Sequence, residues 1–157
     1  MTSLPPLPDS VRHAAIVSGY FNPLHIGHLD MMEAARGMAD ALIVIVNSDH
    51  QQLLKKGKVI TTEADRLRIV SALRVADAAL VAVDEDGSVA RSLEAIHAAY
   101  PDIELTFCNG GDRSPQGDPV PTAEAGVCDR LGITMTWGVG GEAKADSSSR
   151  INEALGI

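Results

Sequence analysis

The sequence predicts an α/β fold in which a parallel sheet is covered by helices on both faces. Short apolar runs rich in β-branched residues recur along the chain with little polar alternation, which is typical of strands buried on both faces. Turn-forming residues bound these runs, and segments with helical periodicity separate them. This alternation predicts a doubly wound, three-layer α/β/α arrangement of about five strands.

Five segments are expected to form the strands. Each is a short apolar run, so the side chains on both of its faces can be buried. Strands that are parallel and joined by helices give a Rossmann-like sheet. The expected strands are 13–18 (HAAIVS), 41–47 (ALIVIVN), 79–83 (ALVAV), 103–108 (IELTFC) and 133–137 (ITMTW).

The segments between the strands are expected to form the helices. Pro23 cannot continue a helix backwards, so the first helix should begin after it. Thr62, followed three positions later by Asp65, is a typical N-terminal cap. The expected helices are 26–38, a short one around 49–54, 62–74, 88–99, 122–131 and 147–155.

Length and composition indicate one domain. The 157 residues suffice for a single core, which we expect over 13–157 after a loose, Pro-rich lead-in at 1–12. No apolar run approaches the roughly 20 residues of a membrane span, and the first residues do not have the pattern of a signal peptide. The net charge of -8 argues against a nucleic-acid-binding role. Cys108 and Cys128 have no CxxC spacing and are expected to be free thiols in a reducing cytoplasm.

Three stretches that follow expected strands are candidates for a ligand site. They are 18–28, 109–113 and 138–149. In open parallel sheets, ligands bind beyond the carboxyl ends of the strands, where the strand order reverses. We therefore expect these stretches to converge there.

A histidine pair at the start of the first helix is the most informative feature of these stretches. His25 and His28 are three positions apart, so they can share one helix face. A helix N-terminus favours phosphate, and imidazoles there can donate hydrogen bonds to phosphate oxygens. Gly19 and Gly27 allow the backbone to approach a bulky ligand. The pair therefore predicts a phosphate-binding site.

Two other interpretations of the pair stay open. The histidines can be surface or capping residues, or they can bind a metal ion. The pair supplies two ligands where zinc takes three or four, and Asp30 and Glu33 are the acidic residues close in sequence that would add to them.

The segment around the pair resembles the signature of the HxGH nucleotidyltransferase superfamily, in its cytidylyltransferase-like group. That group includes glycerol-3-phosphate cytidylyltransferase, heptose-phosphate adenylyltransferase and archaeal FAD synthetase. The motif reads His25-Ile26-Gly27-His28, and the preceding Gly-x-Phe-[Asp/Asn] pattern reads Gly19-Tyr20-Phe21-Asn22. Similar family segments follow in order: VNSD at 46–49, LLKKGK at 53–58, TEADRLRIVSALRVAD at 62–77, NGGDR at 109–113 and DSSSRI at 146–151.

The resemblance implies a nucleotidyltransferase. A phosphate oxygen of an acceptor would attack the α-phosphorus of a nucleoside triphosphate, and pyrophosphate would leave. The catalytic residues implied are His25, His28 and Lys55. Phosphate or acceptor contacts are implied for Lys56, Lys58, Arg66 and Arg113, although a lysine run by itself is usually a solvated loop. Nucleotide contacts are implied for Gly19, Tyr20, Phe21, Asn22, Gly27, Asn109, Gly110, Gly111, Asp112, Ser147, Ser148 and Ser149.

The resemblance also implies partners. The nucleotide is CTP or ATP, with Mg2+ bound mainly through its phosphates, and the acceptor is a small phosphorylated or phosphonylated compound. No metal site built by the protein alone is implied. A homodimer is implied by analogy with relatives.

The choice of nucleotide base depends on where the chain departs from its relatives. Cytidylyltransferases acting on glycerol and choline phosphates carry Arg-Thr-Glu-Gly-Ile before the final serine motif, and this chain has EAKAD at 142–146. NGGD at 109–112 is closer to the heptose adenylyltransferases. We take transfer of CMP as the first expectation and an adenylyltransferase, or a non-catalytic nucleotide-binding module, as alternatives. The segment DRSPQGDPVPTAEAG at 112–126 is expected to be a loop over the acceptor site.

Several of the implied site residues also have ordinary structural interpretations. Arg66 can pair with Glu63 on one helix face, and Asp112 can simply form a turn with the glycines before it. Ser147 can act only as a helix cap, and His97 is expected to be a surface histidine.

Overall fold

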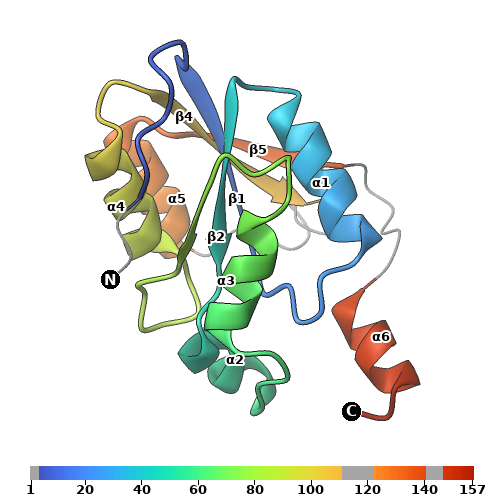
Figure 1. The fold of residues 1–157 in the computed structure, drawn as a ribbon. Helices are drawn as coiled ribbons and strands as arrows, with labels where there is room; N and C mark the ends of the chain where they lie inside the picture. The colour runs from blue at the N-terminus through green and yellow to red at the C-terminus, as the bar shows by residue number, and fades with distance from the viewer. Residues whose placement is uncertain (1–3, 111–121, 141–146) are drawn as a thin grey trace.

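A five-stranded sheet forms the centre of the molecule in a computed structural model that describes residues 4–110, 122–140 and 147–157. All neighbouring strands are parallel, in the order β3-β2-β1-β4-β5. Figure 1 shows the sheet with the helices around it. The strand order reverses at β1, so the doubly wound, Rossmann-like prediction is confirmed. The strands are β1 (His13–Gly19), β2 (Ala41–Val46), β3 (Ala78–Val81), β4 (Glu104–Gly110) and β5 (Thr134–Val139).

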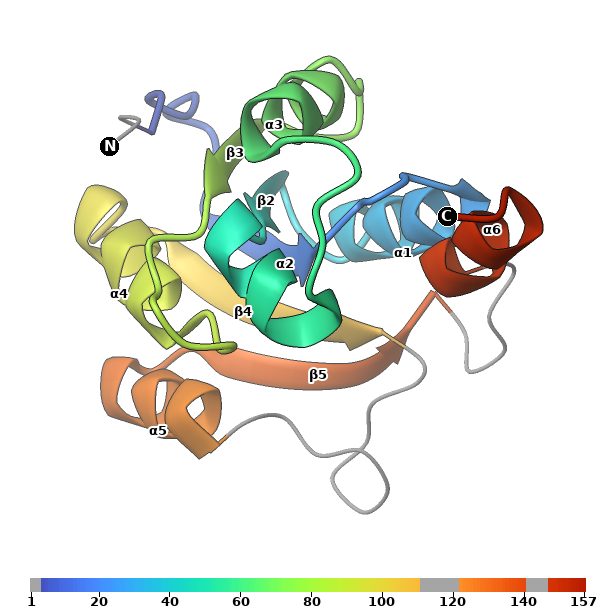
Figure 2. The same cartoon turned by 90° about the horizontal axis from the view of Figure 1, so that it is seen from below.

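Helices cover both faces of this sheet, as predicted. Figure 2 shows α1 and α3 on one face and α4 and α5 on the other, with α2 in front of the strand ends and α6 beside α1. The helices are α1 (Ile26–Arg36), α2 (Asp49–Lys56), α3 (Glu63–Ser71), α4 (Ala90–Ala99), α5 (Thr122–Leu131) and α6 (Ser148–Ala154). In the described part of the chain, no helix is long and apolar enough to cross a membrane.

The sheet separates two apolar clusters. Ile43 and Ile45 of β2 pack in the cluster that contains α4 residues, whereas Leu42 and Val44 pack in the cluster that contains α1 residues. Every residue of β2 is buried. This burial on both faces explains why the strand shows no polar alternation.

The N-terminal segment differs from the loose lead-in that the sequence predicts. Val11 is buried, and Leu4 and Leu7 pack against the cluster under α4 and α5. The Tyr100 hydroxyl donates a hydrogen bond to the Pro5 carbonyl at 2.5 Å. Apolar side chains in an otherwise Pro-rich segment thus extend the core.

The ends of some elements also differ from the predictions. Helix α1 ends at Arg36 because Gly37 forms its C-terminal cap, and α3 ends at Ser71 with Ala72 as its cap. The expected loop at 112–126 is partly helical, since α5 begins at Thr122. The rest of that stretch lies outside the described residues.

A buried arginine on α3 connects the segments that follow β1 and β2. The Arg66 side chain is 1% exposed, and its guanidinium donates to the carbonyls of Tyr20, Asn47 and Thr61 at 2.6–2.8 Å. A fourth bond, of 2.8 Å, reaches the Asp49 carboxylate. Four of its five N–H donors are therefore occupied within the protein.

This geometry corrects two expectations for Arg66. Its ion-pair partner is Asp49 and not Glu63, which instead exchanges backbone-to-carboxylate bonds with Asp49. The implied phosphate contact is also wrong, because the guanidinium is buried among carbonyls. Arg66 positions the strand-to-helix connections.

Glycine is required where the chain leaves β5. A Cβ atom on Gly140 would lie 2.9 Å from the Cα atom of Met31 on α1, and the φ angle there is +88°. Gly138 has a similar φ of +70°, yet a Cβ atom on it would meet nothing within 4 Å. The two positions differ in the space around them and not in the sign of φ.

The first prediction concerns this close approach. Gly138→Ala should lower the free energy of unfolding by about 1–2 kcal/mol through its positive φ alone. Gly140→Ala should cost about 1–3 kcal/mol more, because α1 must also move away. Urea unfolding of both variants measures the difference, and equal losses would contradict the packing described.

The second prediction concerns Arg66. Replacing Arg66 by Met leaves Asp49 and three carbonyls without their buried donor, so the free energy of unfolding should fall by about 3–5 kcal/mol. Arg68→Met is the matched control, since Arg68 is exposed on the same helix, and its effect should stay within about 0.5 kcal/mol. Equal stability of the two variants in urea unfolding would refute the positioning role.

Candidate functional site

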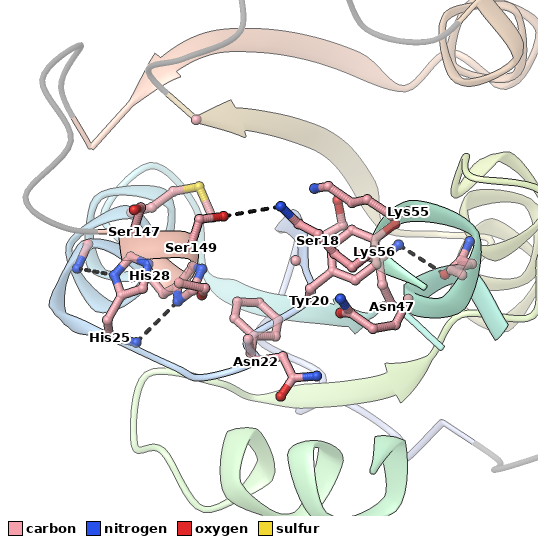
Figure 3. Close-up of a pocket in the computed structure, with 18 of the residues that line it drawn as sticks. Ser18, Tyr20, Asn22, His25, His28, Asn47, Lys55, Lys56, Ser147 and Ser149 are labelled. Atoms are coloured by element: carbon pink, nitrogen blue, oxygen red, sulfur yellow. Dashed lines mark hydrogen bonds between the residues drawn. The ribbon is translucent and has the colours of Figure 1, made fainter. Parts of the chain in front are cut away.

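A cavity of about 840 Å³ lies at the carboxyl end of the sheet. Residues at the ends of β1, β4 and β5 line it, together with the start of α1, one face of α2 and the start of α6. In Figure 3, His25, His28 and Ser147 lie on one side of the cavity, and Lys55 and Asn47 lie on the other. A volume of this size is typical of a small-molecule site.

The two histidines cap α1 through their Nδ1 atoms. The Gly27 backbone N–H donates to Nδ1 of His25 at 3.0 Å. The His25 backbone N–H donates to Nδ1 of His28 at 3.2 Å. This is the reciprocal arrangement that serine and glutamate form in an ordinary capping box. The capping interpretation is therefore correct, and both rings also line the cavity.

These caps determine which ring nitrogen carries the proton. A backbone N–H can only donate, so Nδ1 of both rings must be the unprotonated, accepting nitrogen. In neutral His25 and His28, the proton is then on Nε2, which becomes a hydrogen-bond donor. The rings are stacked, with centroids 3.8 Å apart. The site thus holds two stacked imidazole donors.

Phe21 supports the second ring. Its side chain is buried and meets the His28 ring edge-on, with centroids 4.9 Å apart. A Cβ atom on Gly19 would lie 2.7 Å from the Phe21 ring, so a larger residue there would displace that ring. Gly19, Phe21 and His28 are therefore one packing unit.

Asn22 and Ser148 join the loop before α1 to the C-terminal helix. The Asn22 carbonyl accepts from the side-chain amide of Asn152 at 3.1 Å, and the Ser148 hydroxyl donates to the Pro23 carbonyl at 2.7 Å. Ser147 caps α6 by accepting from the Arg150 N–H at 3.0 Å. These bonds bring the start of α6 to the histidine side of the cavity.

The lysines of α2 line the opposite side. Nζ of Lys55 lies 4.4 Å from the centroid of the Tyr20 ring, a cation–π contact. Nζ of Lys56 donates to the Ser149 hydroxyl at 3.2 Å, which links α2 to α6 across the cavity (Figure 3). Lys58 also lines the cavity. Cationic side chains thus face the helix starts.

The ends of β4 and β5 supply a third wall. Asn109 is buried and donates to the Thr136 carbonyl at 3.0 Å, and Gly110 lines the cavity beside it. Gly111, Asp112 and Arg113, which complete this predicted stretch, lie outside the described residues.

A cysteine thiol also lines the cavity at the end of β4. Burial raises the pKa of the Cys108 thiol, which therefore stays protonated at neutral pH. Burial likewise raises the pKa of Cys128 to about 11. Both cysteines are free, as predicted. Neither is suited to nucleophilic catalysis.

Metal-ligating groups are sparse. Over residues 4–110, 122–140 and 147–157, no group of three or more His, Cys, Asp or Glu side chains could hold a metal ion. Asp30 lines the cavity one turn into α1, and Glu33 does not. In this part of the chain, no third side chain is placed to bind a zinc ion together with His25 and His28.

The structure brings the predicted residues together with two exceptions. Arg66 does not line the cavity, and 111–113 are not described. Sequence reasoning missed Gln52 and Asn152, which also line it. Helical spacing could have identified both residues, because it places them on the same helix face as a predicted site residue. Gln52 lies three positions before Lys55, and Asn152 lies three positions after Ser149.

Similar proteins support this picture. Residues 16–116, more than half of the chain, match the cytidylyltransferase-like family. The Bifunctional protein HldE of Koribacter versatilis is 35% identical over 104 residues, covering 65% of this chain and 20% of that protein. The FAD synthase of Methanothrix thermoacetophila is 38% identical over 88 residues, covering 56% of this chain and 57% of that protein. The alignments thus span about a fifth of the first relative and just over half of the second.

Solved structures agree with the fold. A lipopolysaccharide core biosynthesis protein from Thermoplasma volcanium superposes with a TM-score of 0.57 at 26% identity, over 85% of this chain and 98% of that chain. A Vibrio parahaemolyticus protein described as a nicotinate-nucleotide adenylyltransferase superposes with a TM-score of 0.54 at 18% identity, over 92% and 86% of the two chains, and shows the fold alone. The family match covers more than half of the chain, and the histidine-capped α1 and the Rossmann-like sheet agree with it. This chain therefore belongs to the cytidylyltransferase-like family.

Proposed function

We propose that this chain transfers a nucleoside monophosphate from a nucleoside triphosphate to a small phosphorylated or phosphonylated acceptor, with release of pyrophosphate. The observation that carries the proposal is the pair of stacked imidazoles at the start of α1. Their Nδ1 atoms accept backbone N–H bonds, and their Nε2 atoms are therefore donors on a cavity wall. This is a donor set suited to phosphate oxygens.

The proposed reaction forms one P–O bond and breaks another. An acceptor phosphate oxygen attacks the α-phosphorus, and the bond from that phosphorus to the bridging oxygen of the leaving pyrophosphate breaks. Negative charge increases on the leaving oxygens and shifts among the non-bridging oxygens, so positioned donors lower the barrier more than a strong base would. An acceptor phosphate is already an anion and needs no residue to deprotonate it.

Each wall of the cavity has a role in this proposal. Nε2 of His25 and His28 donate to oxygens of the triphosphate near the reacting phosphorus. Lys55, Lys56 and Lys58 neutralise phosphate charge from the α2 side. The α6 serines hold the terminal phosphates, and the nucleoside lies toward β4. The residues proposed for nucleotide contacts are Gly19, Tyr20, Phe21, Asn22, Gly27, Asn109, Gly110, Ser147, Ser148 and Ser149, all of which line the cavity.

Mg2+ is proposed to enter as part of the substrate, bound to the triphosphate. Magnesium keeps several waters and is usually held by phosphates plus one or two carboxylates. The described residues fit this use: Asp30, Glu124 and Glu153 line the cavity, yet no group of three or more His, Cys, Asp or Glu side chains among the described residues could hold a metal ion by itself. The ion supplies charge neutralisation on the phosphates.

The choice of base is a separate question. The resemblance to glycerol-phosphate cytidylyltransferases favours CMP, whereas one relative is an FAD synthase, and FAD contains adenine. CTP and ATP are therefore both donors to test. A reducing cytoplasm suits the two free, buried thiols. The homodimer proposed from the family resemblance is measurable by light scattering during size-exclusion chromatography.

The third prediction is product formation. With Mg2+ and either CTP or ATP, the protein should release pyrophosphate in the presence of one of five acceptors: glycerol 3-phosphate, phosphocholine, heptose 1-phosphate, FMN or aminoethylphosphonate. Release should depend on the acceptor, because the acceptor supplies the attacking oxygen. Nucleotide binding without pyrophosphate release for every pair would indicate a binding module instead.

The fourth prediction tests the histidine pair. His28→Ala removes one donor to the transferred phosphate and should lower turnover by about 100-fold or more. His97→Ala is the control, because His97 lies on α4 and does not line the cavity. Turnover measured with saturating acceptor should be unchanged in the control. A near-normal rate in the His28 variant would remove this ring from the mechanism.

A further inference from the structure

Two neighbouring glutamines on α2 have opposite hydrogen-bonding states. The Gln51 side chain is completely buried and makes four bonds: it donates to the carbonyls of Asp86 and Ser88 and accepts from Asn47 and the Ser48 N–H, at 2.7–3.0 Å. Every polar atom of that amide is used inside the protein. Gln51 is a structural residue.

Gln52 is nearly as buried, yet its side-chain amide is unused. Only 6% of the residue is exposed, and Oε1 has no hydrogen-bond partner among the described residues. No other side-chain bond of Gln52 is made within this part of the chain. Buried polar groups almost always have partners, and those that do not call for an explanation. Gln52 lines the cavity, and its unbonded Nε2 atom, unlike Oε1, is not fully buried, so a ligand can accept a hydrogen bond from it.

The position of Gln52 indicates which ligand it serves. Gln52, Lys55 and Lys56 are related by steps of three and four, so they share one face of α2. All three line the cavity. A phosphate held by the lysines therefore places the adjoining part of its molecule beside the Gln52 amide.

Buried hydrogen bonds hold the neighbouring wall of the cavity. Gln51 holds the segment 86–88 through two carbonyls, and the Val89 N–H donates to the buried Glu124 carboxylate at 2.8 Å. Gly87 and Val89 line the cavity beside α2. A wall held by these buried bonds, with the Gln52 amide beside it, is a preorganised polar contact.

We propose that Gln52 determines acceptor specificity by hydrogen-bonding hydroxyl groups on the carbon skeleton of a phosphomonoester. The amide Nε2–H is a donor, and a hydroxyl oxygen can accept from it. The lysines on the same face disfavour an acceptor with a cationic end. This inference rests on the proposed function, because it takes the bound phosphomonoester to be the acceptor of the reaction. The binding preference itself is tested by binding measurements alone.

The test measures equilibrium binding by calorimetry, with a nonhydrolysable CTP or ATP analogue and Mg2+ present. The probes are glycerol 3-phosphate, ribose 5-phosphate and mannose 1-phosphate, each compared with the alkyl phosphate of equal carbon number. Choline phosphate and ethanolamine phosphate are the probes with a cationic end. At least one hydroxylated probe should bind wild-type protein about tenfold more tightly than its alkyl counterpart. Gln52→Met keeps the side-chain length and removes both polar atoms, so this ratio should fall to near one.

Control variants separate specificity from folding. Leu53→Met changes the next residue, which is exposed and does not line the cavity, and it should retain the wild-type ratio. Gln52→Ala removes the amide without adding bulk and should reproduce the Gln52→Met result. Affinity for the nucleotide analogue should be the same in all variants, which shows that the site is folded.

The outcomes distinguish this inference from the proposed function. The inference is overturned if no hydroxylated probe binds more tightly than its alkyl counterpart. It is also overturned if the ratio of the two affinities stays at its wild-type value in both Gln52 variants. A Gln52-dependent preference shown only by choline or ethanolamine phosphate would overturn it as well. Pyrophosphate release, measured separately, decides whether the bound compound is an acceptor. Discrimination by Gln52 without pyrophosphate release would retain the binding role and reject nucleotidyl transfer.

Discussion

Two bonds from backbone N–H groups to imidazole nitrogens organise the site. The N–H groups of Gly27 and His25 occupy Nδ1 of His25 and His28, so the caps of α1 and the proton positions on both rings are decided together. A capping serine would accept from the same N–H group, but it has no second ring atom that could donate to a ligand. An imidazole cap has a second nitrogen on the far side of the ring, and that nitrogen becomes a donor. Local helix chemistry thus produces a surface of hydrogen-bond donors suited to phosphate oxygens.

The loop that carries the first histidine is held from several directions. Arg66 binds the Tyr20 carbonyl, Asn22 accepts from the Thr61 N–H, and Phe21 packs into the space above Gly19. Phe21 also has a φ of +52°, which is uncommon for a residue other than glycine. Such a conformation persists where the surroundings over-determine it. The cost of this loop is offset by contacts with α3 and with the core, and the result is a fixed position for the His28 ring.

Much of the fold was predictable from local pattern. Strand β2 is a continuous apolar run because it is buried on both faces, and Thr62 caps α3 by accepting from the Asp65 N–H. The His-x-x-His spacing also indicated a shared face at a helix start. These features depend on residues close in sequence, which is why periodicity and spacing identify them.

The parts that sequence reasoning missed depend on long-range contacts. Arg66 has the appearance of a helix-surface residue next to Glu63, and only the fold brings carbonyls from three separate segments around its guanidinium. Gln51 and Gln52 are identical in type and adjacent, and their difference comes from the 86–88 segment that contacts one of them. The packing of Leu4 and Leu7 likewise requires the position of the distant α4 and α5 cluster.

The central claim is that both imidazoles are Nε2–H donors directed by their Nδ1 caps. A long-range ¹H–¹⁵N correlation spectrum of the histidine side chains, recorded at about pH 8 where ordinary imidazoles are neutral, reads the protonated nitrogen of each ring directly. We expect Nδ1 unprotonated and Nε2 protonated for His25 and His28, with both Nε2 signals shifting when Mg2+ and a nonhydrolysable nucleotide analogue are added, while the His97 signals stay in place. A proton on Nδ1 of either ring, or unchanged signals at a saturating concentration of the analogue, would contradict the account.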